Sequence, residues 1–395
     1  MTVVFLVLAT IALVMAIHPL VTYPLSLVLL AYFRDKPQQP ANRSEAQKAT
    51  PVDKDRPKVA ILLCVRNEEN VIGKRIENLL ALADSVPGTR ILVYSDYSTD
   101  SSVDILKTYQ QRITLVEATE HLGKTHGMNL LVERTDAQFL VFTDAAVSMN
   151  TQALTNVIRH FDDPDVGCVC GKIVASVSGG DELITSTAST SIKYWAFDAT
   201  VRRLETCVAS VIGAHGPLFA IRRDLHEPVP VELFDDFYLS MAILYNGHRV
   251  VQAEDFIGVK AVATKSADEF RRKIRVACQA FNVHRQMAPR LQKQTWLIRY
   301  MYAGHKTLRW MTIFSFAGAA VFFTLALLTT NYAVWALAVW AMFAVLMGLG
   351  YLGIQPFSMI LQGILHLVAT GIGVVQSIRG TVYQTWSSAA SARRG

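Results

Sequence analysis

The sequence predicts an α/β protein whose doubly wound domain lies between apolar segments that cross a membrane. Residues 57–265 alternate short apolar runs with amphipathic helical stretches, the βαβ pattern of a parallel sheet covered by helices. Hydrophobic residues make up 51% of the 395 residues, and the excess is concentrated at the two ends. This composition argues against an ordinary soluble enzyme.

The first segment, 1–33, is predicted to be an N-terminal transmembrane segment. It contains no Asp, Glu, Lys or Arg and exceeds the about 20 apolar residues that cross a bilayer. It lacks the early basic region and the small-residue cleavage site of a removed signal peptide. Basic residues begin at Arg34, so the positive-inside rule places the polar linker 34–56 and the following domain in the cytoplasm. We therefore expect a multi-pass protein of the inner (plasma) membrane.

The net charge of +6 indicates contact with membrane lipids and no binding of nucleic acid, because the basic residues cluster near the apolar segments. The middle domain carries no stripe of Lys and Arg interleaved with aromatic residues. Five cysteines fall in the cytoplasmic part, and their spacing suggests neither a disulfide framework nor a zinc site: Cys64, Cys168, Cys170, Cys207 and Cys278.

Four short apolar runs are the predicted strands of the sheet, at 58–65, 90–94, 113–116 and 139–142. The first run is continuously apolar, as expected of a strand buried on both faces of a parallel sheet. Helical patterns follow the first three runs, at 66–80, 103–109 and 128–133. A further strand is predicted over 166–174 and a further helix over 186–208, in which Trp195 is expected to pack in the core or at the membrane interface.

Polar side chains follow three of these strands at the point where each strand ends. Asn67 and Glu68 follow the first strand, Asp96 the second and Asp144 the fourth. Ligands of doubly wound sheets collect at the carboxyl ends of the strands. One carboxylate there is usually a helix cap or a loop residue, but three in successive units predict a binding site.

Two adjacent carboxylates, Asp235 and Asp236, precede another helical pattern, with Leu239 and Ile243 on its apolar face and Gly247 as its stop. Aspartates at this position can be simple caps, which satisfy the free N–H groups and the dipole of the helix. The pair is therefore either a cap or part of the predicted site.

The motifs occur in the order Asn67-Glu68, Asp96 to Asp100, Gly123 to Asn129, Thr143-Asp144-Ala145 and Asp235-Asp236. This order and spacing resemble the membrane-bound inverting family 2 glycosyltransferases, which include cellulose, chitin and hyaluronan synthases. The resemblance covers roughly residues 57–290. It implies a Rossmann-like domain of the GT-A type that transfers a sugar from a nucleotide-diphosphate donor to an acceptor with inversion.

The resemblance places the nucleotide-sugar donor at the strand ends. Glu68 and Asp96, beside Asn67, would accept hydrogen bonds from the base and the ribose. Lys124 would bring positive charge to the diphosphate, as sugar transfer requires.

Asp144 occupies the family's metal position, and the resemblance implies Mg²⁺ or Mn²⁺ there. The sequence departs from the family, because Asp144-Ala145-Ala146 lacks the second carboxylate of an Asp-x-Asp motif. A hard cation can be held by one carboxylate with phosphates and water. His215 or another donor would complete the shell.

The resemblance makes Asp236 the general base for the acceptor hydroxyl, with Asp235 beside it. Two adjacent carboxylates raise each other's proton affinity, which suits a base that works near neutral pH. The loop His215-Gly216-Pro217 resembles the family's acceptor side, where glycine lets the backbone approach a sugar.

Residues 266–310 are predicted to form interfacial helices. Processive synthases of the family carry Gln-x-x-Arg-Trp here, whereas this chain has basic residues and no Trp in 269–282. Arg272 and Arg275 are expected on the diphosphate, and a basic helix face lying on anionic lipid is the alternative. The missing Trp weakens the case for a processive polymerase.

The C-terminal membrane segments occupy 311–378. They contain two apolar spans, Met311–Leu328 and Tyr332–Gly350, and a third stretch, Ile354–Ile378, that either crosses or re-enters. The basic tail 379–395 favours a cytoplasmic end. So few spans leave little protein to line a polysaccharide channel, so we expect a homo-oligomer or a lipid acceptor.

The expected function is inverting hexosyl transfer from a nucleotide-diphosphate sugar, taken to be a UDP-sugar, to a lipid-linked or polysaccharide acceptor. Such transfer would serve the synthesis of exopolysaccharide or cell-surface glycan. Two alternatives stay open, a processive polysaccharide synthase and an inactive scaffold that binds nucleotide sugar. A transporter is disfavoured because the apolar spans carry no paired charges.

Overall fold

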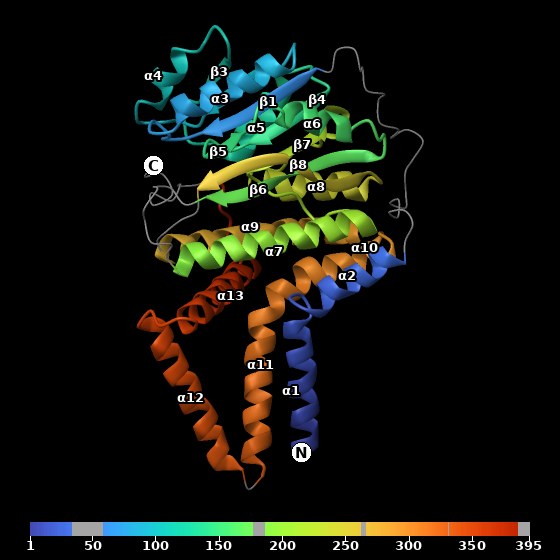
Figure 1. Ribbon diagram of the computed structural model, residues 1–395, viewed down its shortest axis with the longest axis vertical. Helices are drawn as coiled ribbons and strands as arrows, with labels where there is room; N and C mark the ends of the chain where they lie inside the picture. The colour runs from blue at the N-terminus through green and yellow to red at the C-terminus, as the bar shows by residue number, and fades with distance from the viewer. Residues whose placement is uncertain (34–57, 177–185, 262–265, 331, 386–395) are drawn as a thin grey trace.

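The computed structural model describes residues 1–33, 58–176, 186–261, 266–330 and 332–385. The predicted linker 34–56 and the last ten residues of the predicted tail lie outside this part of the chain. An α/β domain stands on a group of apolar helices (Figure 1). This is the fold class that the sequence predicted.

One eight-stranded sheet forms the centre of the domain, in the order β3-β2-β1-β4-β7-β6-β8-β5. Its strands are β1 Val59–Val65, β2 Arg90–Ser95, β3 Thr114–Glu117, β4 Phe139–Thr143, β5 Val147–Met149, β6 Val166–Ser176, β7 Leu218–Arg222 and β8 Arg249–Ala261. β1 to β4 pair in parallel, as the apolar runs predicted. β7 runs antiparallel to β4 and β6, so the second half of the sheet is mixed.

Strand β1 is buried along its whole length. Ala60 and Leu62 belong to one apolar cluster, and Ile61 and Leu63 belong to the other. Both faces of the strand are covered, which explains the unbroken apolar run. Burying each Leu or Ile stabilises the fold by roughly 1.5–3 kcal/mol, so β1 firmly positions the sheet edge that carries the candidate site.

Helices cover the sheet and separate it from the apolar helices. They are α3 Ile72–Ser85, α4 Ser102–Lys107, α5 Lys124–Glu133, α6 Ala153–His160, α7 Ser186–Val208, α8 Asp235–Tyr245 and α9 Ser266–Gln292. α7 and α9 lie between the sheet and the apolar helices (Figure 1).

The N-terminal apolar segment is bent. It forms two helices, α1 Thr2–Ile17 and α2 Thr22–Tyr32, at 61° to each other. α1 packs along α11, whereas α2 packs against α7 (Figure 1). The 16 residues of α1 extend about 24 Å, less than the about 30 Å of a bilayer core. Together the two helices are long and apolar enough for a broken span or a re-entrant segment, so the N-terminal transmembrane segment over 1–33 stays a prediction.

Three helical stretches in the described residues are long and apolar enough to cross a membrane: Trp296–Leu328, Ala333–Tyr351 and Phe357–Ile378. The first consists of α10 Trp296–Tyr302, a π-helical segment Ala303–Thr307 and α11 Leu308–Leu328. α11 and α12 (Ala333–Tyr351) descend from the domain and join at their far ends (Figure 1). α13 (Phe357–Ile378) packs most extensively against α9 and also contacts α12, α11 and α7.

The described end of the chain lies on the α/β domain. The side-chain amide of Gln279, on α9, donates to the carbonyl of Tyr383 at 2.6 Å. The backbone of Gln384 lies against Gly123, in the loop before α5. The start of the tail is therefore on the same side as the domain, which is the arrangement that its basic charge favoured.

Candidate functional site

The ends of β1 and β2 are tied together by hydrogen bonds. Asn67 has a left-handed backbone, with φ 53°, and its Oδ1 accepts from the N–H of Thr99 at 2.8 Å. The N–H of Asp96 donates to the carbonyl of Val65 at 2.9 Å. Glu68, which is 8% exposed, lies in the same loop as Asn67. Three predicted donor-site residues thus gather at one edge of the sheet.

Asp96 is fully buried and orders the loop before α5. Its carboxylate accepts from the N–H groups of Leu122 at 2.9 Å and Gly123 at 3.1 Å, and lies 2.7 Å from Nδ1 of His121. Gly123 itself has φ 97°, a conformation that favours glycine. These contacts of Asp96 are all within the protein, so its predicted contact with uracil or ribose stays a prediction.

A carboxylate lies between two ammonium groups just after β4. Oδ1 of Asp144 is 3.1 Å from Nζ of Lys124, and Oδ2 is 2.8 Å from Nζ of Lys260. Burial would raise the pKa of Asp144, but the two ammonium groups outweigh burial and hold the pKa well below its usual range. Burial would lower the pKa of Lys124, but Asp144, followed by Asp235 and Asp236, raises it. Both partners are therefore charged at neutral pH.

Lys260 was not predicted from the sequence. It lies on β8, and the antiparallel pairing of β5 with β8 sets it opposite Val147, three residues after Asp144. An isolated lysine in a strand gives no local signal, and only this long-range pairing brings it to the site. The ammonium group of Lys260 therefore pairs with Asp144. The residues after Asp144 lack the second carboxylate of the family's Asp-x-Asp motif.

The predicted metal site depends on Asp144 alone. Among the described residues, no three His, Cys, Asp or Glu side chains are arranged to hold a metal ion. His215 packs edge-on against Trp195, with ring centroids 5.7 Å apart. Burial, followed by the charge of Arg202, lowers the pKa of His215 to about 3, so its ring is neutral. One carboxylate fits a hard cation when phosphate oxygens and water supply the other ligands.

The two adjacent aspartates open α8. Its N-cap residue is Phe234, whose side chain forms no capping hydrogen bond, and both aspartates lie in the first turn, so neither is the N-cap residue of the simpler alternative. Asp235 is 2% exposed, with Oδ2 3.7 Å from Nζ of Lys124. Oδ1 of Asp236 accepts from the N–H of Phe237 at 2.7 Å. The start of α8 therefore brings the pair to the Lys124 side of the site.

Asp236 has the environment of a general base. Burial, followed by the negative charge of Asp235, raises the pKa of Asp236 to about 6. A Cβ atom added to Gly216 would lie 2.6 Å from Oδ2 of Asp236, so a larger residue there would crowd the carboxylate. The predicted acceptor loop His215-Gly216-Pro217 is therefore in contact with the predicted base.

The two arginines of α9 that were predicted to bind the diphosphate differ in whether a carboxylate already pairs with them. Nε and Nη2 of Arg272 donate to the carboxylate of Glu269 at 2.9 and 2.8 Å, so Arg272 is already paired. Arg275 forms no ion pair with a carboxylate in the described part of the chain. Burial, followed by the charge of Arg272, lowers the pKa of Arg275. Arg275 is thus the more available of the two for a phosphate.

The chain is similar to curated glycosyltransferases. The chain is 22% identical over 241 residues to an N-acetylglucosaminyltransferase of Neorhizobium galegae, which covers 57% of this chain and 55% of that protein. It is 27% identical over 120 residues to a beta-monoglucosyldiacylglycerol synthase of Synechocystis, covering 29% of this chain and 25% of that protein. The chain therefore spans about half the length, or less, of these curated relatives.

The fold is shared with a solved structure, the mannosyltransferase PcManGT from Pyrobaculum calidifontis in complex with GDP-Man and Mn²⁺. The two chains superpose with a TM-score of 0.70 at 20% identity, over 95% of this chain and 99% of the other. This likeness identifies the fold as GT-A-like. Residues 60–229 match the family model described as "Glycosyl transferase family 2", and the chain therefore contains a glycosyltransferase family 2 domain.

Proposed function

We propose that the chain transfers a hexosyl group, with inversion, from a UDP-sugar to a lipid-linked or glycan acceptor in the synthesis of a cell-surface glycan or exopolysaccharide. The observation that carries this proposal is the placement of Asp236. Its carboxylate, with a pKa of about 6, lies against the Gly216 loop and near the Lys124–Asp144 pair. A base and a cationic donor side thus share one site.

The donor diphosphate would bind to the ammonium groups of Lys124 and Lys260. These groups now pair with Asp144, and a diphosphate can compete for them with charge-assisted hydrogen bonds. Mg²⁺ or Mn²⁺ held by Asp144 would add positive charge to the leaving diphosphate. Asn67 and Glu68 would hold the nucleotide at the neighbouring strand ends.

Asp236 would take the proton of the acceptor hydroxyl. The hydroxyl oxygen then bonds to the anomeric carbon, and the bond from that carbon to the diphosphate oxygen breaks. The diphosphate leaves with the electron pair, and Asp236 ends protonated. One base and no covalent intermediate give inversion at the anomeric carbon.

The apolar helices would anchor the domain to the inner (plasma) membrane. The Oγ1 atoms of Thr2 and Thr329 are 2.9 Å apart, at the end of α1 and α11 that lies farthest from the domain (Figure 1). The basic residues that follow Phe33 in the sequence support a cytoplasmic position of the domain. The far end of α1, α11 and α12 would therefore face outside.

Replacing the base should separate binding from transfer. Asp236→Asn is expected to lower kcat by about 100-fold or more, because the amide cannot accept the proton, with nucleotide binding retained. Initial rates of nucleotide release and equilibrium binding of UDP measure the two effects. The matched control is Glu232→Gln, an exposed carboxylate four residues earlier, which should keep parental activity. Near-parental turnover of Asp236→Asn would exclude Asp236 as the base.

The pH dependence should follow the raised pKa of Asp236. The base works ionised, so kcat should fall as pH drops through about 6. The stability of the fold should change with pH in the opposite direction to kcat. A raised native pKa stabilises the fold below pH 4, and this stabilisation is lost as pH rises through 6. Asp236→Asn should then be more stable than the parent at pH 8 by up to about 3 kcal/mol, and the difference should vanish near pH 4. Thermal unfolding at both pH values measures it.

Lys260 should contribute to donor affinity. Lys260→Met is expected to raise the KM for the donor by about tenfold or more, because a charge-assisted hydrogen bond to phosphate is lost. Lys172→Met is the matched control, since Lys172 lies on the neighbouring β6 and pairs with Glu254 at 2.7 Å. Equal donor KM values in the two variants would remove Lys260 from the donor site.

Divalent cations should be required for turnover. Excess EDTA is expected to lower the rate of nucleotide release by at least about tenfold, because Asp144 and the diphosphate lose their shared cation. Adding Mg²⁺ or Mn²⁺ in excess of the chelator should restore the rate. Full turnover in EDTA would refute metal dependence and leave the assignment of Asp236 intact.

Cysteine labelling should report the two sides of the membrane. Cys207 on α7 is the exposed natural cysteine, and Tyr332, next to the turn between α11 and α12, is 61% exposed. In intact bacterial cells an impermeant maleimide should label Tyr332→Cys, whereas Cys207 should react only after permeabilisation. The reverse pattern would contradict the cytoplasmic domain.

A further inference from the structure

The membrane side of the site contains a cluster of charged side chains that the proposed mechanism does not use. They come from α7, the π-helical segment and the start of α11, which meet where the domain joins the apolar helices (Figure 1). Its members are Asp198, Arg202, Glu205, His305, Lys306 and Arg309.

Asp198 is fully occupied by two guanidinium groups. One carboxylate oxygen lies 2.6 Å from Nε of Arg202, and the other lies 2.7 Å from Nη1 of Arg309. Arg202 also donates from Nη1 to the carbonyl of Gly213 at 2.8 Å. This ion-pair network therefore reaches the backbone two residues before the acceptor loop His215-Gly216-Pro217.

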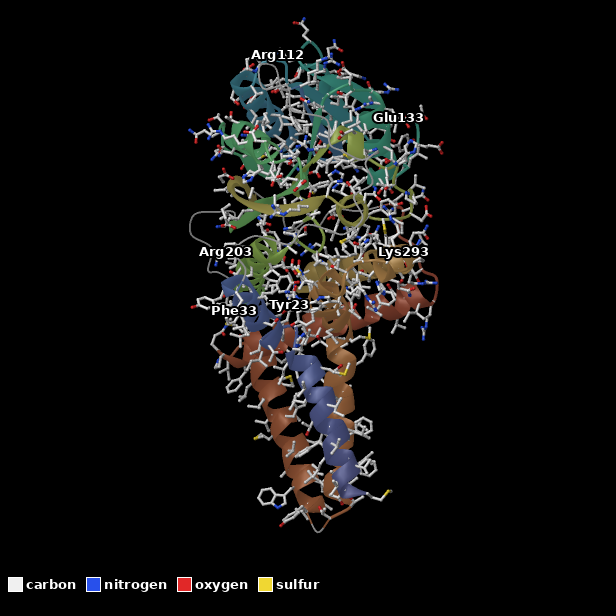
Figure 2. The ribbon with its side chains drawn as sticks, turned by 90° about the vertical axis from the view of Figure 1, so that its right-hand side faces the viewer. Tyr23, Phe33, Arg112, Glu133, Arg203 and Lys293 are labelled. Carbon is white, nitrogen blue, oxygen red and sulfur yellow. The ribbon has the colours of Figure 1, made fainter. Side chains whose placement is uncertain are left out.

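Glu205 is occupied as well. It is fully buried and accepts from the hydroxyl of Tyr23 at 2.5 Å and the N–H of Ile212 at 3.0 Å. Nδ1 of His305 lies 2.7 Å from the same carboxylate. Tyr23 comes from α2, at the junction between the domain and the apolar helices (Figure 2). Neither carboxylate of the cluster is left to neutralise a further cation.

Lys306 is the cation in excess. Two carboxylates face two guanidinium groups and this ammonium group, and no carboxylate in the described part of the chain lies within 4 Å of its Nζ. Its Nζ is 5.0 Å from the ring centroid of Phe237, the residue that follows the base. Its Cε would lie 3.5 Å from a Cβ atom added to Gly213. Lys306 therefore extends between Gly213, just before the acceptor loop, and the start of α8.

The position of Lys306 along its helix selects the kind of anion. It lies two residues before α11, whose exposed apolar side chains begin at Phe314, so it stands at the membrane surface on the domain side. A lysine at this depth can also extend along the helix to lipid headgroups. The contacts of Lys306 with Phe237 and the Gly213 loop instead direct it inward, toward the site. A partly buried ammonium without a counter-charge favours an anionic ligand.

We propose that Lys306 binds the phosphate group of a membrane-embedded acceptor whose hydroxyl is then glycosylated at Asp236. The acceptor is therefore an amphiphile with a phosphate and a nearby hydroxyl, and not a neutral lipid such as diacylglycerol. This inference rests on the proposed function. Binding of the acceptor needs no donor and no turnover, so it can be tested without the transfer reaction.

The test measures equilibrium binding to the full-length protein in a neutral detergent by calorimetry. The probes are dihexanoyl-phosphatidylinositol, which carries phosphate and hydroxyls, dihexanoylglycerol, which lacks the phosphate, and inorganic phosphate. The phosphatidylinositol is expected to bind about ten- to a hundred-fold more tightly than the neutral lipid, as a hydrogen bond to a charged group provides. Equal affinity for both lipids would overturn the proposal, and so would inorganic phosphate binding as tightly as the phospholipid.

Variants of Lys306 test whether its side chain is responsible for the preference for the phospholipid. Lys306→Met should remove the preference for the phospholipid, and Lys306→Arg should keep most of it. Lys293→Met is the matched control, because Lys293 is exposed beyond the end of α9 (Figure 2) and should not affect binding. UDP binding to each variant shows that its donor side is folded. A phospholipid preference unchanged in Lys306→Met would reject the site, and the preference of the parent protein tests the proposal even if this variant does not fold.

Discussion

The buried carboxylate of Glu205 connects the membrane helices to the reaction site. It lies on α7, within the α/β domain, and it accepts from Tyr23 on α2 and from the backbone of Ile212, while His305 of the π-helical segment completes its contacts. A buried carboxylate is costly unless such partners surround it. The segments that supply these partners, which are α2, the loop at Ile212 and the π-helical segment, must therefore assemble together around α7. Because Ile212 begins the loop that reaches Gly216, the membrane surface and the base are held in a fixed relation.

The surroundings of two carboxylates of the site shift their pKa values in opposite directions. Asp144 lies between two ammonium groups, which hold its pKa low despite burial. Asp236 is buried beside a second negative charge, which raises its pKa to about 6. Groups whose pKa values are pushed apart in this way are suited to different tasks. A permanently ionised carboxylate can organise cations and phosphate, whereas one that titrates near neutrality can accept a proton and release it. Asp144 and Asp236 have identical side chains, so their different roles follow from their positions in the fold.

The sequence predicted those site residues whose positions depend on elements that are close together in the chain. The strand ends at Asn67, Asp96 and Asp144 were predictable because parallel strands with two buried faces leave unbroken apolar runs and end at one edge. Lys260 was not, since it depends on the pairing of β5 with β8, which are far apart in the chain. The 61° bend in 1–33 was also missed, because uniform apolarity carries no signal for a break. The pairing of Arg272 with Glu269, three residues apart on one helix, could have been anticipated.

The exposure of the apolar helices bears on the kind of product. α12 is apolar around its circumference, and Val334, Trp335 and Leu337 are more than 60% exposed, as expected of side chains that face lipid. α13 packs most extensively against α9 and also contacts α12, α11 and α7. Residues 311–328, 333–351 and 357–378 contain no Asp, Glu, Lys or Arg, so these helices of a single chain offer few polar side chains to line a route across the membrane. A polymer leaving the cell would need such a route from further copies, whereas a lipid acceptor that stays in the membrane needs none. The arrangement favours a lipid-borne acceptor.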